Sequence, residues 1–285
     1  MRSTLLFLSL LSSLVSATPA PVYPGFKTVW SDGFEGSAGD TPNKNRWNLI
    51  TDVRTNGEIQ TYSTSNRNLQ ISGGGTVQLV PLKSKKSGKW TSARIETKKA
   101  FTPKRGKLTM FEAAIRFGDN PASRRQGLWP AFWMLGDAVH HGTEWPLCGE
   151  LDIMETVNGL PTAHGTTHCG VGEVGGPCHE PMGRGASVGL SDYGWHTWTL
   201  QVDRTNGEGG WKGEVIRWLV DGNVFHQVTG ADIADQGIWA TLAHSPMFMI
   251  LNVAVGGSWP GDPNAATADS YGSMMEVEYV AVYSS

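Results

Sequence analysis

Short runs in which apolar and polar residues alternate dominate this chain of 285 residues. Runs rich in β-branched and aromatic residues recur between clusters of Gly, Asn and Asp, a pattern typical of strands separated by turns. Residues 220–224 (VDGNV) place Asp-Gly between apolar positions and predict a hairpin turn. The clearest predicted strands are residues 76–82, 107–117, 196–203, 215–220 and 276–283.

Helical periodicity contributes little to this pattern. Only residues 231–236 predict one short helical turn. Many short strands with frequent turns favour a sandwich of two sheets over a parallel βαβ design. No internal repeat or low-complexity linker interrupts residues 21–285, so we expect them to form a single all-β domain, a size that sandwiches commonly reach.

The first 20 residues have the pattern of a secretory signal peptide. Arg2 supplies a positive charge, residues 5–15 form an apolar run, and small residues precede possible cleavage sites after Ala17 or Ala20. The run is too short for a membrane span, which needs about 20 apolar residues. We therefore expect a secreted protein that acts outside the cell or in a cell wall, with no membrane partner.

Charge and cysteine content narrow the function classes. The net charge is −3 and the pI is about 6.2, so no basic surface points to nucleic acid.

Cys169 and Cys178 flank a Gly- and Pro-rich stretch and could close one loop as a disulfide, which an exported chain tolerates. Cys148 is then expected to be a buried free thiol. No CxxC spacing predicts a zinc site.

The segment 149–157 (GELDIMETV) carries the most specific chemistry. Its three carboxylates are interleaved with apolar residues, unlike a solvated run of charges. In a strand, Leu151 and Ile153 would face the core while Glu150 and Asp152 face the other side. Glu155 breaks this alternation and would point into the core, where an unpaired carboxylate is costly.

One extra residue in the strand restores the alternation. A β-bulge near residues 153–154 would return Glu155 to the side of Glu150 and Asp152, and bulges are frequent beside active sites. The two glutamates would then lie roughly 13 Å apart at Cα. Their carboxyl groups could converge to about 5 Å, the separation of a retaining glycosidase. A strand with solvent-facing carboxylates is the alternative.

Four separated segments together resemble glycoside hydrolase family 16. They are residues 127–136 (GLWPAFWMLG), 149–155, 166–169 (TTHC) and 252–261 (NVAVGGSWPG). Within that family they are similar to the laminarinase branch, endo-1,3(4)-β-glucanases, as found in fungi. The resemblance implies a concanavalin A-like β-jelly roll of two antiparallel sheets, with an open cleft that binds β-glucan.

The resemblance also implies roles for the catalytic residues. Glu150 matches the nucleophile, Glu155 the general acid/base, and Asp152 the carboxylate that orients the nucleophile. The two residues between Asp152 and Glu155 match the bulged laminarinase form, whereas lichenases and xyloglucan transglycosylases have one. The expected chemistry is retaining hydrolysis of internal 1,3-β or mixed 1,3-1,4-β linkages. A wall-remodelling transglycosylase and a non-catalytic β-glucan lectin are the alternatives.

Candidate substrate-binding residues come from the same motifs. Indole rings can stack on the apolar face of a pyranose, and His168 matches the family histidine near the catalytic carboxylates. Arg94 lies in a segment (SARI) that resembles a cleft strand, and Asn56 begins a stretch (NGEIQTY) that resembles a family segment at the end of the cleft. The candidates are Trp129, Trp133, Trp259, His168, Arg94 and Asn56.

No metal or other cofactor is needed for catalysis by two carboxylates. Some family members bind a structural calcium ion, but Gly33 in the segment 32–35 (DGFE) replaces the usual acidic residue, which argues against the ion here. We expect a monomer whose partner is the polysaccharide. No N-x-S/T sequon occurs in the chain, so we do not expect N-glycosylation.

Overall fold

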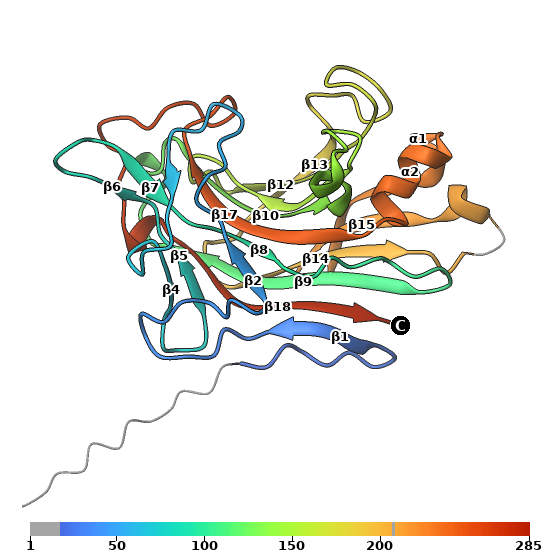
Figure 1. Ribbon diagram of the computed structural model, residues 1–285, viewed down its shortest axis with the longest axis horizontal. Coiled ribbons are helices and arrows are strands. Elements are labelled where there is room, and N and C mark those ends of the chain that lie inside the picture. Colours follow the sequence, from blue (N-terminus) through green and yellow to red (C-terminus); the bar gives the residue numbers. More distant parts are fainter. Residues whose placement is uncertain (1–17, 207–208) are drawn as a thin grey trace, which may run out of the picture.

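The computed structural model describes residues 18–206 and 209–285, and it consists mainly of two antiparallel sheets stacked face to face (Figure 1). One sheet has seven strands in the order β13-β12-β11-β10-β17-β8-β2. The other has eight, in the order β16-β15-β14-β9-β18-β5-β4 with β1 paired to β18. This arrangement confirms the predicted all-β sandwich. The predicted signal segment lies almost entirely in residues 1–17, outside the described residues.

The strands of the seven-stranded sheet are β2 (Trp47–Leu49), β8 (Arg94–Thr97), β10 (Leu128–Gly136), β11 (Glu150–Glu155), β12 (Thr162–His168), β13 (Arg184–Gly189) and β17 (Met247–Val255). Those of the eight-stranded sheet are β1 (Lys27–Asp32), β4 (Leu69–Ile71), β5 (Val77–Leu79), β9 (Leu108–Phe117), β14 (His196–Asp203), β15 (Val215–Val220), β16 (Asn223–Thr229) and β18 (Met275–Ser284). A small third sheet contains β3 (Thr61–Tyr62), β6 (Leu82–Lys83) and β7 (Trp90–Ser92).

Helices are few and short. They are α1 (Gly230–Ile233), α2 (Gln236–Ala243) and the 3₁₀ turns η1 (Ala122–Arg124), η2 (Asp137–His141), η3 (Gly210–Gly213) and η4 (Tyr271–Ser273). None of the helices among the described residues has the length and apolar character needed to cross a membrane.

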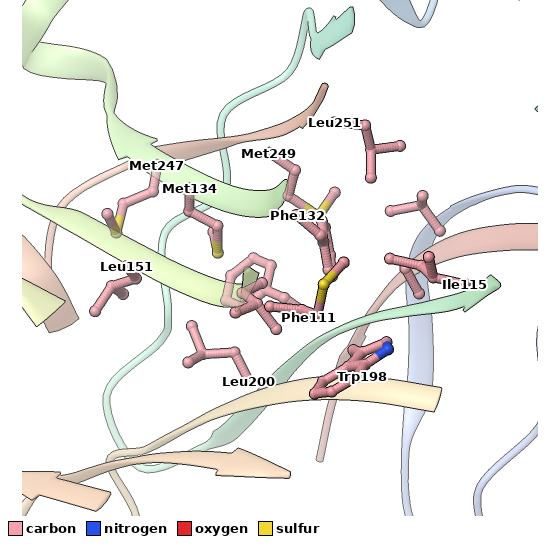
Figure 2. Close-up of a cluster of buried hydrophobic side chains, with 14 of the residues drawn as sticks. Phe111, Ile115, Phe132, Met134, Leu151, Trp198, Leu200, Met247, Met249 and Leu251 are labelled. Carbon is pink, nitrogen blue, oxygen red and sulfur yellow. The ribbon is translucent and has the colours of Figure 1, made fainter. Parts of the chain in front are cut away.

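The core fills the space between the two large sheets (Figure 2). Alternate residues of each strand point into it, as period-two patterning requires. From the seven-stranded sheet come Phe132, Met134, Leu151, Met249 and Leu251, and from the eight-stranded sheet Phe111, Ile115, Trp198 and Leu200. The intervening residues of both sheets therefore face outward, on opposite sides of the molecule.

Four of the five predicted strands match observed ones closely, and the hairpin is also confirmed. Asp221 and Gly222 both have positive φ, 50° and 77°, the conformation that an Asp-Gly hairpin turn requires. The predicted strand 76–82 is wrong in extent, because it divides into β5 and β6 in different sheets. Pro81 lies between them, and proline lacks the N–H that a continuous ladder needs.

The expected single helical turn at 231–236 is also wrong in extent. The chain forms α1 and then α2, which continues to Ala243. Asp235 caps α2 by accepting a hydrogen bond from the Ile238 N–H, and Thr229 forms a capping box with Asp232 before α1. The capping residues therefore determine where the two helices begin. The apolar pattern in this segment is too short to predict them by itself.

Strand β11 contains the predicted bulge. Asp152 and Glu155 are three residues apart, but their partners on β12, Thr166 and His164, are only two apart. Ile153 and Met154 are both fully buried in the core, so two consecutive side chains point the same way. Glu155 consequently returns to the outward side that Glu150 and Asp152 occupy.

A further residue in this strand should be destabilising. Insertion of one Ala between Met154 and Glu155 would shift Glu155 into a core position, and a carboxylate buried there without a partner is expected to lower the free energy of unfolding by several kcal/mol. Urea unfolding measures the change. Ile153→Val is the control, because it keeps the register and should cost only about 0.5–1.5 kcal/mol. An insertion that costs no more than this control would contradict the account of the bulge.

Candidate active site

The three carboxylates of β11 lie together on the outward face of the seven-stranded sheet, which we call the active-site face. Asp152 is 4% exposed and Glu155 8% exposed, although both point away from the core. Glu150 is half-buried. Three carboxyl groups that are packed closely and shielded from water disfavour simultaneous ionisation. The separation of about 5 Å expected between the carboxyl groups of Glu150 and Glu155 stays a prediction.

Burial is the main cause of raised pKa values at all three groups. It raises the pKa of Glu155 to about 7, with a further increase from the charge of Glu150. Burial followed by the charges of Glu155 and Glu150 raises the pKa of Asp152 well above its ordinary range. The pKa of Glu150 is also raised by burial, against lowering contributions from His168 and from a hydrogen bond with Trp145.

Glu155 is held by an indole. Trp129 Nε1 donates a hydrogen bond to Glu155 Oε1 at 2.9 Å, which favours the charged carboxylate and lowers its pKa. The Trp129 ring meets the edge of Trp259 at 5.4 Å between centroids, and Trp259 meets His164 at 5.0 Å. Trp259 is 42% exposed. It is therefore the ring in this group that is open to a sugar.

His168 stands on the other side of the carboxylates. Its Nε2 lies 3.5 Å from Asp152 Oδ2, and Asp152 Oδ2 has no hydrogen-bond partner in the described chain. The centroid of the His168 ring is 5.6 Å from that of the Trp145 ring. The hydrogen bond of His168 goes to Glu180 instead of a carboxylate of β11, because Nδ1 lies 2.7 Å from Glu180 Oε2.

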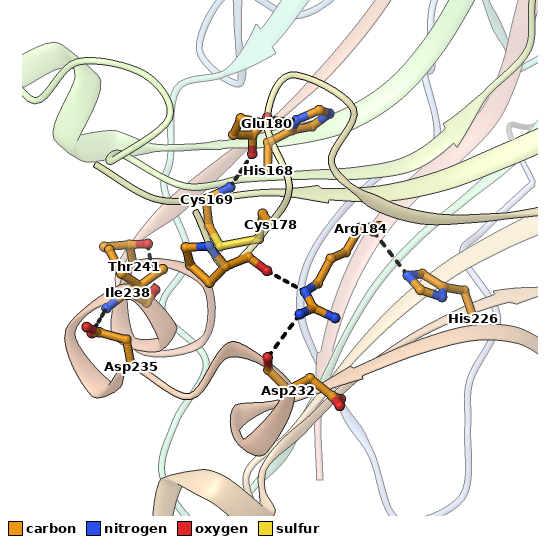
Figure 3. The surroundings of a disulfide bond; sticks show 11 residues. His168, Cys169, Cys178, Glu180, Arg184, His226, Asp232, Asp235, Ile238 and Thr241 are labelled. Carbon is orange, nitrogen blue, oxygen red and sulfur yellow. Dashed lines mark hydrogen bonds and ion pairs between the residues drawn. A yellow bond between two sulfur atoms is a disulfide. The ribbon is translucent and has the colours of Figure 1, made fainter. Parts of the chain in front are cut away.

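Glu180 bridges His168 and the disulfide loop (Figure 3). Cys169 and Cys178 form the predicted disulfide, which closes the loop between them. The Cys169 N–H donates to Glu180 Oε1 at 2.8 Å, while Oε2 faces His168. The Glu180 side chain is fully enclosed. This carboxylate therefore orients the imidazole so that Nε2 faces the active-site carboxylates.

The pKa of His168 reflects this arrangement. Burial alone would lower it, but the hydrogen bond to Glu180 and the charges of Glu150, Glu180 and Glu155 together raise it. The imidazolium form is thus stabilised beside the carboxylates of β11, and it in turn lowers the pKa of Glu150 and of Glu155.

Trp133 and Arg94 form a second group on this face, beside β11. The Arg94 guanidinium lies 4.9 Å from the Trp133 ring centroid and donates through Nε and an Nη to Glu96 at 2.9 and 2.7 Å. Trp133 Nε1 donates to Asn252 Oδ1 at 2.7 Å. Arg94 is only 6% exposed, so it holds Trp133 in place more than it offers an open fork to sugar hydroxyls.

Asn56 lies at the rim of the active-site face. It is exposed with φ of 53°, and its carbonyl oxygen accepts a hydrogen bond from the Ser258 N–H at 2.8 Å. This bond joins the loop of Asn56 to the loop that carries Trp259. The place of Asn56 at one end of a sugar-binding cleft stays a prediction.

Three side chains of this site could together ligate a metal ion. Glu150, Asp152 and His168 each offer a ligand atom, and these atoms lie within 4.8 Å of one another. In the segment 32–35, where some family members bind calcium, both oxygens of Asp32 accept hydrogen bonds, from the Phe34 N–H and from Trp47 Nε1. Cys148 is a buried free cysteine, as predicted.

The sequence did not point to several residues that hold the side chains of this site in place. Asn252 Nδ2 donates to the Tyr62 hydroxyl, which in turn donates to Glu58 Oε2, so two more side chains hold Trp133 through Asn252. Glu58 and Tyr62 belong to the NGEIQTY stretch, whose alternate polar residues were a usable signal. Glu180 and Trp145 lie in loops with no such pattern, and only the fold brings them to the site.

Replacement of Glu180 tests its influence on His168. Glu180→Gln keeps the shape and an acceptor for the Cys169 N–H but removes the negative charge, so the pKa of His168 should fall. NMR titration of the imidazole measures the pKa of His168. Glu173→Gln is the control, because Glu173 is an exposed residue of the same loop and its removal should leave the titration unchanged. An unchanged pKa in Glu180→Gln would refute the pairing.

Comparisons with known proteins show the family and support the fold. A family model described as XgeA-like, catalytic GH16 domain, matches residues 47–187. The crystal structure of an endo-1,3-β-glucanase from Streptomyces sioyaensis is similar with a TM-score of 0.86 and 36% identity, over 94% of this chain and 99% of that one.

Two curated proteins extend the comparison. A β-glucanase from Rhodothermus marinus is 29% identical over 300 residues, which cover 99% of this chain and 94% of that protein. Glucan endo-1,3-β-glucosidase A1 from Niallia circulans is 31% identical over 92% of this chain, and the match spans 38% of that protein's length. The jelly-roll fold is thereby confirmed, and the chain belongs to glycoside hydrolase family 16, as the order of its motifs predicted.

Proposed function

We propose that this glycoside hydrolase cleaves internal 1,3-β linkages of β-glucan, with retention of configuration at the anomeric carbon. Relatives that match nearly the full chain are named endo-1,3-β-glucanase and β-glucanase. The observation that carries the proposal is the bulge of β11, which places Glu150, Asp152 and Glu155 on one face.

Glu155 is the proposed general acid. Its pKa of about 7 keeps a large fraction of the group protonated near neutral pH, which a proton donor requires. In the first step Glu155 protonates the glycosidic oxygen while Glu150 attacks the anomeric carbon. The carbon–oxygen bond to the leaving sugar breaks, and a glycosyl ester on Glu150 forms.

The second step reverses these roles. Glu155, now ionised, takes a proton from a water molecule, which attacks the anomeric carbon and releases Glu150. Glu150 must be an anion at the start of each cycle. Asp152, whose pKa is raised well above its ordinary range by burial, can hold a proton and thereby reduce repulsion, while His168 and Trp145 stabilise the Glu150 charge.

The sugar is proposed to lie across the active-site face beside the exposed ring of Trp259. Trp129, which holds Glu155, contacts Trp259, so a glucose unit stacked there would adjoin the acid/base. Asn56 at the rim offers an amide to hydroxyl groups. Trp133 presents a second indole surface whose tilt is set by Arg94 and Asn252.

Export, oligomeric state and cofactor use complete the proposal. We propose export through the segment 1–20, action as a monomer on the polysaccharide, and catalysis without a metal or other cofactor. The bulged motif also favours the laminarinase branch as it occurs in fungi, although the relatives named above are bacterial.

Product analysis tests the reaction. Laminarin, lichenan and xyloglucan are incubated with the protein, and product sizes are followed over time. We expect mixed oligosaccharides from laminarin early in the reaction, and NMR should show the β-anomer first because the mechanism retains configuration. An α-anomer first product would exclude retention, and turnover only with added acceptor sugar would indicate a transglycosylase.

Substitution of the glutamates tests their roles. Glu150→Gln and Glu155→Gln should each lower kcat/KM on laminarin by about 10²-fold or more, the scale typical of a lost acid–base or nucleophilic group. The control is Glu35→Gln, an exposed glutamate in the loop after β1. Near-normal hydrolysis by either active-site variant would overturn the assignment.

The Trp129 hydrogen bond predicts a shift in pH dependence. A general acid is active while protonated, so kcat/KM should fall as pH rises through about 7, the pKa of Glu155. Trp129→Phe removes a bond that lowers this pKa, so the alkaline limb should move to higher pH. Trp133→Phe is the control, since its N–H donates to Asn252. A limb that moves to lower pH in Trp129→Phe would contradict this role.

A further inference from the structure

A row of polar side chains crosses the outward face of the eight-stranded sheet. Arg116 on β9 is paired in register with Glu276 on β18, Glu276 with Gln78 on β5, and Gln78 with Gln70 on β4. Their chain neighbours, such as Ile115, point into the core. The row therefore lies on the side of the molecule opposite the active-site face.

The row is joined by hydrogen bonds. Arg116 Nε donates to Glu276 Oε2 at 2.6 Å, and Gln78 Nε2 donates to Glu276 Oε1 at 3.0 Å. Gln70 Nε2 donates to Gln78 Oε1 at 3.0 Å and to the Tyr271 hydroxyl at 2.7 Å. The chain of bonds holds these planar groups in a fixed orientation, although Arg116 is 43% exposed.

An exposed aromatic ring stands at each end of the row. His196, the first residue of β14, is paired in register with Ile115 on β9. Trp195, one residue earlier, therefore lies next to Arg116 and extends the row to β14. Its ring lies 5.1 Å from the Arg116 guanidinium carbon. Trp195 is 41% exposed and Tyr271 47% exposed. From Trp195 to Gln70 the row crosses four strand spacings, roughly 19 Å, which suits an oligosaccharide better than a single sugar.

The active-site face contains the same combination of groups. There Arg94 lies over Trp133 and is paired with Glu96, while an amide, Asn252, links Trp133 to Tyr62. On the opposite face, Arg116 contacts Trp195 and is paired with Glu276, and the amides of Gln78 and Gln70 lead to Tyr271. Both sets combine an indole surface with fixed donors and acceptors.

We infer that this row, from Trp195 to Tyr271, is a second β-glucan binding site, separate from the catalytic carboxylates. The inference rests on the proposed function for the identity of the polysaccharide. Exposed rings at both ends would stack on sugar faces, and the ordered amide and guanidinium groups between them would meet hydroxyl groups, while the buried Glu276 holds them in place. Because the two sites face opposite ways, the protein can hold an insoluble glucan while the active-site face works on another chain.

Binding to insoluble glucan tests the site. The parent is the full chain with Glu150→Gln, so that the polysaccharide is not consumed, and the probe is insoluble 1,3-β-glucan. Trp195→Ala and Tyr271→Ala, each added to this parent, should lower the fraction bound at limiting glucan by at least threefold. Val224→Ala is the matched control, because Val224 is 51% exposed on β16 of the same sheet. Trp195→Phe should restore part of the binding.

Hydrolysis assays separate this inference from the proposed function. In the active chain, Trp195→Ala should leave kcat/KM on a short soluble 1,3-β-oligosaccharide within twofold and lower the rate on insoluble glucan severalfold. Unchanged binding by both alanine variants, or loss only in variants whose melting temperature has dropped, would overturn the second site. Sedimentation showing a dimer that Trp195→Ala dissociates would assign the row to a second copy of the chain and also overturn it. Failure of the unsubstituted chain to cleave any β-glucan would instead refute the proposed function.

Discussion

The active site depends on a parity constraint in one strand. Side chains of β11 alternate between core and surface, and in a strand without a bulge Glu155, five residues after Glu150, would lie with Leu151 in the apolar interior. The bulge at Ile153 and Met154 removes this conflict by burying two consecutive side chains. The apolar residues therefore do more than fill the core. Because Ile153 and Met154 are buried together, Glu155 points outward.

Once the carboxylates share a face, their electrostatics follow from neighbours on other strands. Trp129 on β10 and His168 on β12 flank β11, and each stabilises negative charge on a catalytic glutamate. Burial acts in the opposite direction and raises the pKa of all three acids. The site thus balances a low-dielectric setting, which favours protonated groups, against donors that preserve the charge required of the nucleophile.

The sequence was most informative where a local pattern had a single physical solution. The acid spacing in 149–157 required a bulge, and the Asp-Gly pair required a hairpin turn. It was less informative where a residue acts through distant partners. Arg94 matched a cleft position, yet its contact with Trp133 became visible only when the fold placed β8 and β10 on either side of β17. Glu180 carried no signal, because its partner His168 meets it through a folded loop.

The loop that carries Glu180 also links the site to the oxidation state of the chain. Cys169 both forms the disulfide and donates its backbone N–H to Glu180, so the covalent bond and the orientation of His168 share one residue. The core cluster contains the two half-cystines among many other buried side chains and is held by large sheets. A chain produced in a reducing cytosol should therefore assemble its sandwich while its imidazole is poorly aligned. For recombinant work, this makes the choice of expression host a determinant of specific activity as well as of yield.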